Sequence, residues 1–236
     1  MLSYNKQSSI STYTIDKVLI EHLEDYLKLN VLEILHVESQ TSIKVEFTVT
    51  FHDSHGIEKY DSIKEHKFPV FRNDIKGITI ESNLQIQEKE LKIILRFGDI
   101  EENTDLAISL TDDNAREKVS AIEQGIFSLI NHNKNLNRIF YPSPLIVIII
   151  VCVCFISGVL AWQSSYSIKE KFVLGLIFWA VLFYFFSPHY FKGYCSFDTN
   201  KQKQLDKWFT WLITGLLGFL LFSTLLTSIR KNLFGF

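Results

Sequence analysis

Apolar and polar residues alternate along the middle of the chain with the two-residue period of a half-buried strand. The clearest example is Ile43 to His52, in which every second residue is apolar. The turn-forming residues that follow predict a hairpin with a second strand from Ile57 to about Ile63. Weaker patterns predict further strands at 31–37, 78–86, 91–97 and 106–110. Because such strands keep a polar face, we expect a mostly antiparallel sheet.

Two segments that flank most of these strands have apolar residues every three or four positions, the spacing of an amphipathic helix. The first runs from Ile15 to about Leu29, with Thr14 as its expected N-cap. The second begins near Asp112. Residues 1–138 are therefore predicted to form an α+β domain composed of a helix, five or six mostly antiparallel strands, and a second helix.

Residues 139–236 have a different pattern, with three long apolar stretches and few charges. As a helix the first stretch would be about 27 Å long, close to the hydrocarbon thickness of a bilayer. The middle stretch is interrupted at Ser187 to His189, so a full span, a short tilted span and a re-entrant segment remain open. The pattern predicts an all-α transmembrane part of three helices, with spans at about 145–162, 172–191 and 208–229.

Charge is divided unevenly between the two predicted parts. Residues 1–140 carry 16 Lys and Arg against 23 Asp and Glu, whereas the remainder carries 8 against 3. The acidic part has no electrostatic basis for binding nucleic acid directly, because phosphate contacts need clustered cations. The basic part suits contact with a lipid bilayer. With no apolar signal segment at the N-terminus, the sequence predicts a multi-pass protein of the bacterial inner membrane whose N-terminal domain is cytoplasmic.

His52 and His55, in and after the first strand, are candidate metal ligands. They lie beside Asp53 and Glu58, and imidazole with carboxylate is a donor set that zinc accepts. The pattern favours the alternative that His52 continues the polar side of the strand and the others form a turn. Residues 1–138 also lack cysteine, a glycine-flanked serine and a glycine-rich phosphate loop. The sequence thus predicts no metal, no cofactor and no enzyme activity.

Small residues in the apolar stretches are spaced for close helix packing. Ser157 and Ala161 are four residues apart, as are Thr214 and Gly218. This small-xxx-small spacing lets helices approach closely and associate. It predicts either packing among the helices of one chain or a homo-oligomer.

Pro142 and Pro144 precede the first apolar stretch and predict a stiff junction between the two parts. The junction either couples them mechanically or only ends one helix and starts the next. The layout of the whole chain, a small α+β domain followed by uncharged apolar helices, resembles the membrane effectors of bacterial anti-phage defence systems, such as retron, cyclic-nucleotide and Argonaute-associated modules. The resemblance assigns no site residues.

The resemblance implies a sensor or effector of the inner membrane. Its cytoplasmic domain would receive a protein or small-molecule signal and control membrane perturbation or pore formation. One alternative is a membrane-anchored adaptor that localises a cytoplasmic partner through a sheet edge or helix face. Another is a membrane-bound hydrolase that uses the turn containing His52 and His55.

Overall fold

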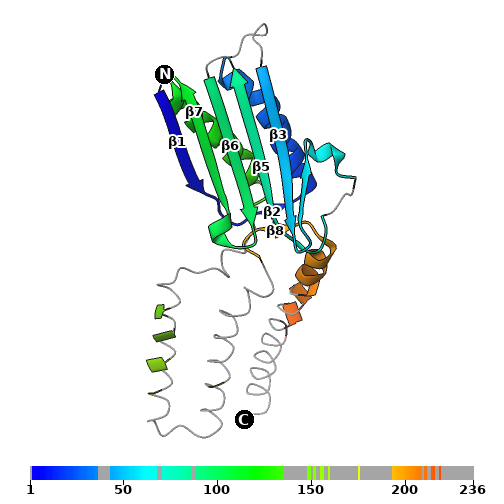
Figure 1. The fold of residues 1–236 in the computed structure, drawn as a ribbon. Coiled ribbons are helices and arrows are strands. Elements are labelled where there is room, and N and C mark those ends of the chain that lie inside the picture. Colours follow the sequence, from blue (N-terminus) through cyan, green and yellow to red (C-terminus); the bar gives the residue numbers. More distant parts are fainter. Residues whose placement is uncertain are drawn as a thin grey trace, which may run out of the picture.

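The computed structural model describes the chain in five main segments, 2–36, 43–67, 71–86, 89–135 and 193–208, together with isolated positions between 148 and 218. The N-terminal part forms an α+β domain of two layers, a six-stranded antiparallel sheet with helices on one of its faces (Figure 1). Residues 193–208 join this domain at one end of the sheet.

The strands lie in the order β1-β7-β6-β5-β3-β4 across the sheet. Their bounds are Leu2–Ser9 for β1, Ile43–Asp53 for β3, Ile57–Tyr60 for β4, Ile75–Ile86 for β5, Lys89–Gly98 for β6 and Asp105–Asp112 for β7. The short strands are β2 (Thr14–Ile15) and β8 (Ser196–Phe197), and the helices are α1 (Lys17–Asp25), the π-helical turn η1 (Tyr26–Asn30), α2 (Val31–Ile34) and α3 (Ala115–Asn131). Two 3-10 turns, η2 (Ile63–Glu65) and η3 (Glu101–Asn103), lie between strands.

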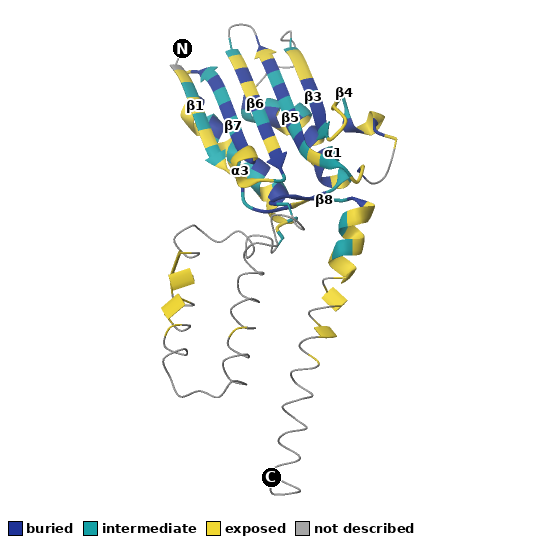
Figure 2. Ribbon diagram, turned by 60° about the horizontal axis from the view of Figure 1, so that its bottom comes forward, coloured by how far each residue is buried: buried dark blue, intermediate teal, exposed yellow. Residues whose placement is uncertain are grey.

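Side chains on the strands alternate between a buried and a more exposed face, as the two-residue period requires (Figure 2). On β6, for example, Leu91, Ile93 and Leu95 are buried. These side chains meet the apolar faces of α1 and α3, which both cover the same side of the sheet. The stripe of α3 that faces the core consists of Ala115, Val119, Ile122, Ile126 and Ile130. Burial of one such side chain contributes about 1.5–3 kcal/mol, so each layer stabilises the other.

Three local predictions about these elements were wrong. The helix expected from Ile15 begins at Lys17, because Asp16 is its N-cap and accepts the Leu19 amide at 2.7 Å. Residues 31–37 begin as the helix α2, in which buried Val31 and Leu35 have helical spacing. The sixth strand of the sheet is instead β1, whose sequence has too few apolar residues for a clear alternating pattern.

Residues 193–199 insert into the end of the domain, far along the chain from the elements they contact. The amide of Ser196 donates to the Tyr13 carbonyl at 2.9 Å, and β8 pairs in parallel with β2. Phe71 donates its amide to the Asp198 carbonyl at 3.0 Å. Tyr194 and Cys195 are buried, and burial raises the pKa of the Cys195 thiol to about 11. A helix over residues 200–208 follows this insertion.

The predicted transmembrane part is contradicted. Within the part of the chain that the structure describes, no helix is long and apolar enough to cross a membrane. The predicted spans at 145–162, 172–191 and 208–229 lie for the most part outside the described residues. The prediction rests on apolar composition, whereas a span also requires a continuous helix of about 20 residues.

This finding also corrects the functional predictions that depended on the spans. An integral, multi-pass protein of the bacterial inner membrane with a cytoplasmic domain is not supported, nor is a membrane effector that perturbs the bilayer or forms pores in anti-phage defence. The membrane-anchored adaptor is not supported for the same reason, because it too needs helices that cross the bilayer.

Gly125 lets the Tyr26 ring pack closely against α3. The Tyr26 hydroxyl donates to the Ile122 carbonyl at 3.3 Å, and a Cβ placed at residue 125 would overlap the phenol ring. The tyrosine lies in the π-helical turn η1, so this contact joins the first helical segment to α3.

Gly125→Ala should destabilise the domain by about 1–3 kcal/mol, because overpacking outweighs the gain in helix propensity of about 1 kcal/mol. Urea unfolding monitored by circular dichroism measures the change, with exposed Gln124→Ala as the control. Adding Tyr26→Phe should reduce the cost of the glycine substitution. Equal stability of Gly125→Ala and the unmodified chain would contradict the close packing.

Cys195 should resist alkylation in the folded protein, because its thiol is 1% exposed and its pKa is raised. Treatment with iodoacetamide at pH 8 followed by peptide mass spectrometry should find Cys152, which is exposed, modified first. Urea should make the two thiols react alike. Rapid modification of Cys195 without denaturant would show that residues 193–199 do not stay inserted.

Candidate binding site on the uncovered face of the sheet

One face of the six-stranded sheet carries no helix among the described residues. The pairing register shows which side chains stand next to one another on it, because directly opposed residues share a face. Asn5 on β1 lies opposite Ser109 on β7, and Ser109 lies opposite Lys92 on β6. Lys92 in turn lies opposite Asn83 on β5. These four residues form a polar row across four strands.

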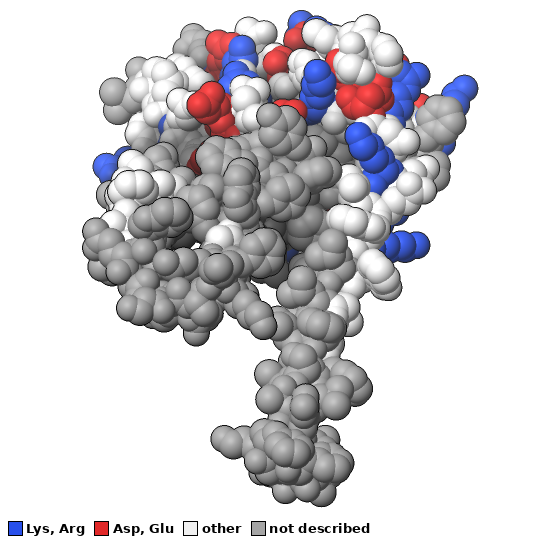
Figure 3. All heavy atoms as spheres, turned by 90° about the horizontal axis from the view of Figure 1, so that it is seen from below, with Lys and Arg blue, Asp and Glu red and all other residues white. Residues whose placement is uncertain are grey.

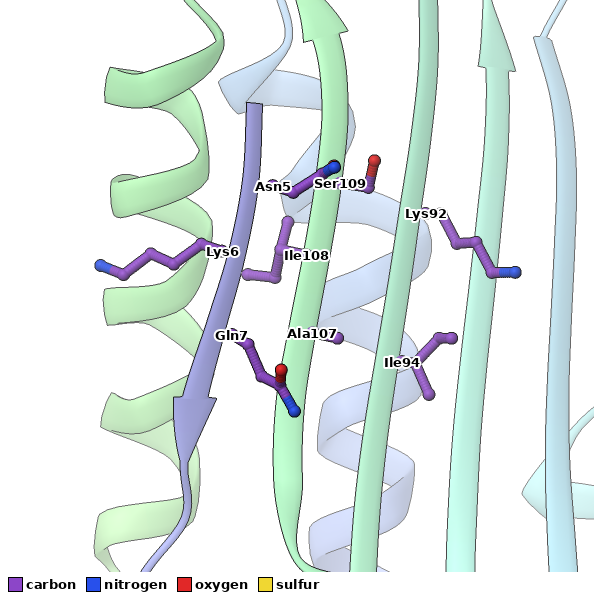
Figure 4. Close-up of a pocket in the computed structure, with 8 residues that line it drawn as sticks. All are labelled: Asn5, Lys6, Gln7, Lys92, Ile94, Ala107, Ile108 and Ser109. Atoms are coloured by element: carbon purple, nitrogen blue, oxygen red, sulfur yellow. The ribbon is translucent and has the colours of Figure 1, made fainter. Parts of the chain in front are cut away.

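The next row along the strands contains two apolar residues. Gln7 lies opposite Ala107, and Ala107 lies opposite Ile94. The small Ala107 side chain leaves a hollow of about 360 Å³ between its longer neighbours. Figure 4 shows the side chains that line this hollow, which we call the polar hollow, and among them Lys6 points away toward α3.

Lys92 lines the hollow and forms no ion pair with any described residue, and its ammonium points toward β5, away from Asn5 and Gln7 (Figure 4). Two other cations of the same face are paired. Arg96 contacts Asp105 at 3.0 Å, and Lys44 contacts Glu46 at 2.6 Å. An unpaired ammonium beside a hollow is therefore available to a negatively charged group of a ligand.

Beside Lys92, the Oδ1 atom of Asn83 is buried and has no hydrogen-bond partner among the described residues. Gln7 donates its side-chain amide to Asp105 at 3.1 Å, which holds one wall of the polar hollow in place. Buried polar groups are normally paired, but this atom could accept a hydrogen bond from a ligand only if the Asn83 side chain turned toward the surface.

Charge on the whole uncovered face is balanced between the two signs. The register places on it the cations Lys44, Lys59, Lys92 and Arg96 and the acids Glu46, Glu81, Glu90 and Asp105. Both signs also intermingle on the described part of the molecule seen from below (Figure 3). A balanced face offers no broad positive patch for a polyanion such as nucleic acid.

The two candidate metal ligands have separate partners. His52 Nε2 lies 3.2 Å from the Thr79 hydroxyl, on the neighbouring strand. His55 is exposed, and its Nε2 lies 3.3 Å from Asp74 Oδ2. Asp53 accepts the backbone amides of His55 and Gly56, both at 2.7 Å, which is the bonding of a turn. Across the described residues, no group of three His, Cys, Asp or Glu is placed to hold a metal ion.

Most of the residues predicted to mediate helix association or to form the proline junction lie outside the residues that the structure describes. Ser157, Ala161, Pro142 and Pro144 are not among the described residues. Thr214 and Gly218 occupy exposed helical positions, and the Thr214 hydroxyl donates to the Thr210 carbonyl at 2.7 Å. Their role in helix association stays a prediction.

Asp112 is the acid with the largest shift in pKa among the described residues, and its environment is structural. Burial alone would raise its pKa, but hydrogen bonds from Lys118, the Asp113 amide and Lys89 outweigh burial and lower the pKa to about 2. The carboxylate joins the end of β7 to the first turns of α3 and to the start of β6. It has no place in the polar hollow.

Asp112→Asn should lower the free energy of unfolding at pH 7 by about 2 kcal/mol, because a pKa of about 2 lies below the ordinary value of 3.8. A lowered folded pKa stabilises the domain above pH 3.8, and this contribution disappears as the pH falls toward 2. Urea unfolding at pH 7 and pH 3 should therefore show a smaller difference at the lower pH. Exposed Asp113→Asn is the control, and a difference independent of pH would contradict the assignment.

Comparison of the chain with known protein families, with curated proteins and with solved structures finds no match. No relative therefore supports the resemblance to anti-phage effectors. The function proposed for the polar hollow rests on its geometry.

Sequence reasoning missed the residues of the polar hollow, and one signal was available. Ile94 is an apolar residue at a polar-side position, between Lys92 and Arg96 on β6. Such an interruption of the alternation marks an apolar side chain on the solvent side of a strand. Asn5 and Gln7 gave no comparable signal, because β1 itself was not predicted.

Proposed function

We propose that the protein is a binding module, and that its polar hollow docks a polypeptide segment carrying an Asp or Glu side chain. The observation that carries the proposal is the unpaired Lys92 side chain beside a mainly apolar hollow, in which Asn5, Gln7 and Ser109 supply polar groups. Lys92 would pair with the carboxylate of the partner. Asn5 and Ser109 would exchange hydrogen bonds with its main chain, which has both donors and acceptors.

The shape of the hollow favours a polypeptide over a small molecule. Small-molecule sites are usually clefts that bury most of the ligand, whereas the residues that line this hollow all come from the three neighbouring strands β1, β7 and β6. The apolar Ile94 and Ala107 side chains can pack against one side chain of an extended segment. An exposed ion pair contributes about 0–1 kcal/mol, so binding is expected to be weak and reversible.

Fluorescence polarisation with a set of labelled eight-residue peptides tests the proposal on the full chain. Each acidic peptide is matched by a version in which Glu and Asp become Gln and Asn. We expect some acidic peptides to bind, their neutral versions to bind about fivefold more weakly, and Lys92→Ala to remove that preference, since about 1 kcal/mol corresponds to fivefold. Lys92→Arg should keep the preference.

Lys44→Ala is the matched control, because Lys44 lies on the same face but is paired with Glu46. It should leave peptide binding unchanged. Absence of binding by every acidic peptide, or binding that Lys92→Ala does not alter, would overturn the proposal. Free glutamate is a separate arm: if it binds as tightly as the peptides, the ligand is a small carboxylate and the polypeptide part is wrong.

A further inference from the structure

The edge strand β1 is open to pairing along its whole length. Among the described residues its only strand neighbour is β7, with which Leu2–Ser9 pair in one continuous register. Sheet edges are normally protected by proline, by a bulge, by charged side chains or by shortness. β1 is eight residues long, contains no proline and shows no shift in register.

The one charged residue of β1 does not protect the edge. Lys6 pairs with Glu123 of α3, and Ser8 donates to the same carboxylate. This draws the charge to the helix side of the sheet (Figure 4). The opposite edge is different, because β4 has only four residues, Glu58 and Lys59 lie within it, and the neighbouring β3 has a register shift between His52 and Asp53.

The free backbone groups of β1 belong to its odd-numbered residues. Ile10, just after the strand, donates its amide to Thr104, which continues the register between β1 and β7. Successive residues of a strand direct their N–H and C=O groups to opposite sides. The even-numbered residues therefore bond to β7, and Ser3, Asn5, Gln7 and Ser9 direct their backbone groups to the open edge.

We propose that this edge pairs with β1 of a second copy of the chain, antiparallel about a two-fold axis at Asn5. Asn5 would lie opposite Asn5 of the second copy, and Ser3 opposite Gln7. About six backbone hydrogen bonds would form between the free odd-numbered residues. Lys6 would lie opposite Tyr4, whereas an axis at Lys6 would place like charges directly opposite each other, which is destabilising.

Pairing of this kind joins the two sheets into one and brings the two polar hollows together. Asn5 borders each hollow on the edge side, so the second copy's Asn5 would complete that border. In Figure 4, α3 lies beside β1 on the side of the open edge, so the two copies of α3 would also come close to each other in the dimer. The inference does not depend on peptide binding, because it rests on the edge of the strand rather than on Lys92.

Light scattering after size exclusion measures the mass of the full chain, which is 27.5 kDa per copy. We expect a dimer for the unmodified chain and for Asn5→Ala, which keeps the backbone N–H. Asn5→Pro removes an N–H that β7 does not use, and should give the monomer with unchanged circular dichroism. Should proline disturb the fold, Asn5→Lys places two like charges at the axis and should weaken the dimer at low salt.

Crosslinking tests the register directly. In a Cys152→Ser, Cys154→Ser background, Asn5→Cys should form an intermolecular disulfide on mild oxidation, because opposed Cα atoms of bonded strand pairs are about 5.5 Å apart. Ser109→Cys, one strand further from the edge, should not. A monomeric unmodified chain, a dimer that Asn5→Pro and Asn5→Lys leave intact, or equal crosslinking at both positions would overturn the proposal.

Discussion

Burial of one face of the six-stranded sheet against α1 and α3 is the constraint on which the domain depends. The strands supply alternate apolar side chains to that face, and the helices supply complementary stripes, so neither layer can be removed without exposing the other. The opposite face is left with polar and charged residues. The core determines the arrangement of side chains on this uncovered face. The buried residues of β6 and β7 hold the two strands in register, and the register fixes the positions of Lys92, Ser109 and Ala107. The candidate site is thus positioned by the core, although none of its side chains on the uncovered face belongs to the core.

Electrostatic pairing separates structural charges from charges that form no ion pair with a described residue. Asp112, Glu123 and Glu24 each accept several hydrogen bonds, which lower the pKa of each carboxyl despite its burial. Arg96 is likewise satisfied by Asp105. On the uncovered face, Lys59 and Lys92 form no ion pair with a described acid, and of these two Lys92 lines the hollow. A site that relies on one ammonium and several neutral polar groups suits selective but weak recognition.

The middle of the sheet could be predicted from the sequence, and the edges of the domain could not. β3, β5 and β6 bury every second residue, so their period is plain in the printed sequence. β1 lies at an edge and contributes mainly polar residues, and α2 has the β-branched residues that also suit a strand. Of the residues in the candidate site, only Ile94 could be recognised from the sequence. Asn5, Ser109 and Lys92 become neighbours through pairing of β1, β7 and β6, and this pairing cannot be read from the local sequence. The apolar stretches lie for the most part outside the described residues, and apolar composition does not by itself establish a membrane-crossing helix.

The insertion of residues 193–199 delays completion of the domain during synthesis of the chain. β8 pairs with β2, yet the ribosome synthesises β8 long after every other strand of the domain. Until that segment emerges, Tyr13, Ile15 and Phe71 lack part of their final surroundings. Contacts between such distant parts of a chain form late, because closing a long loop costs conformational entropy before the contact repays it. The domain can therefore be finished only after residue 199 has been synthesised, and until then the growing chain carries an unfinished edge that molecular chaperones would be in a position to cover.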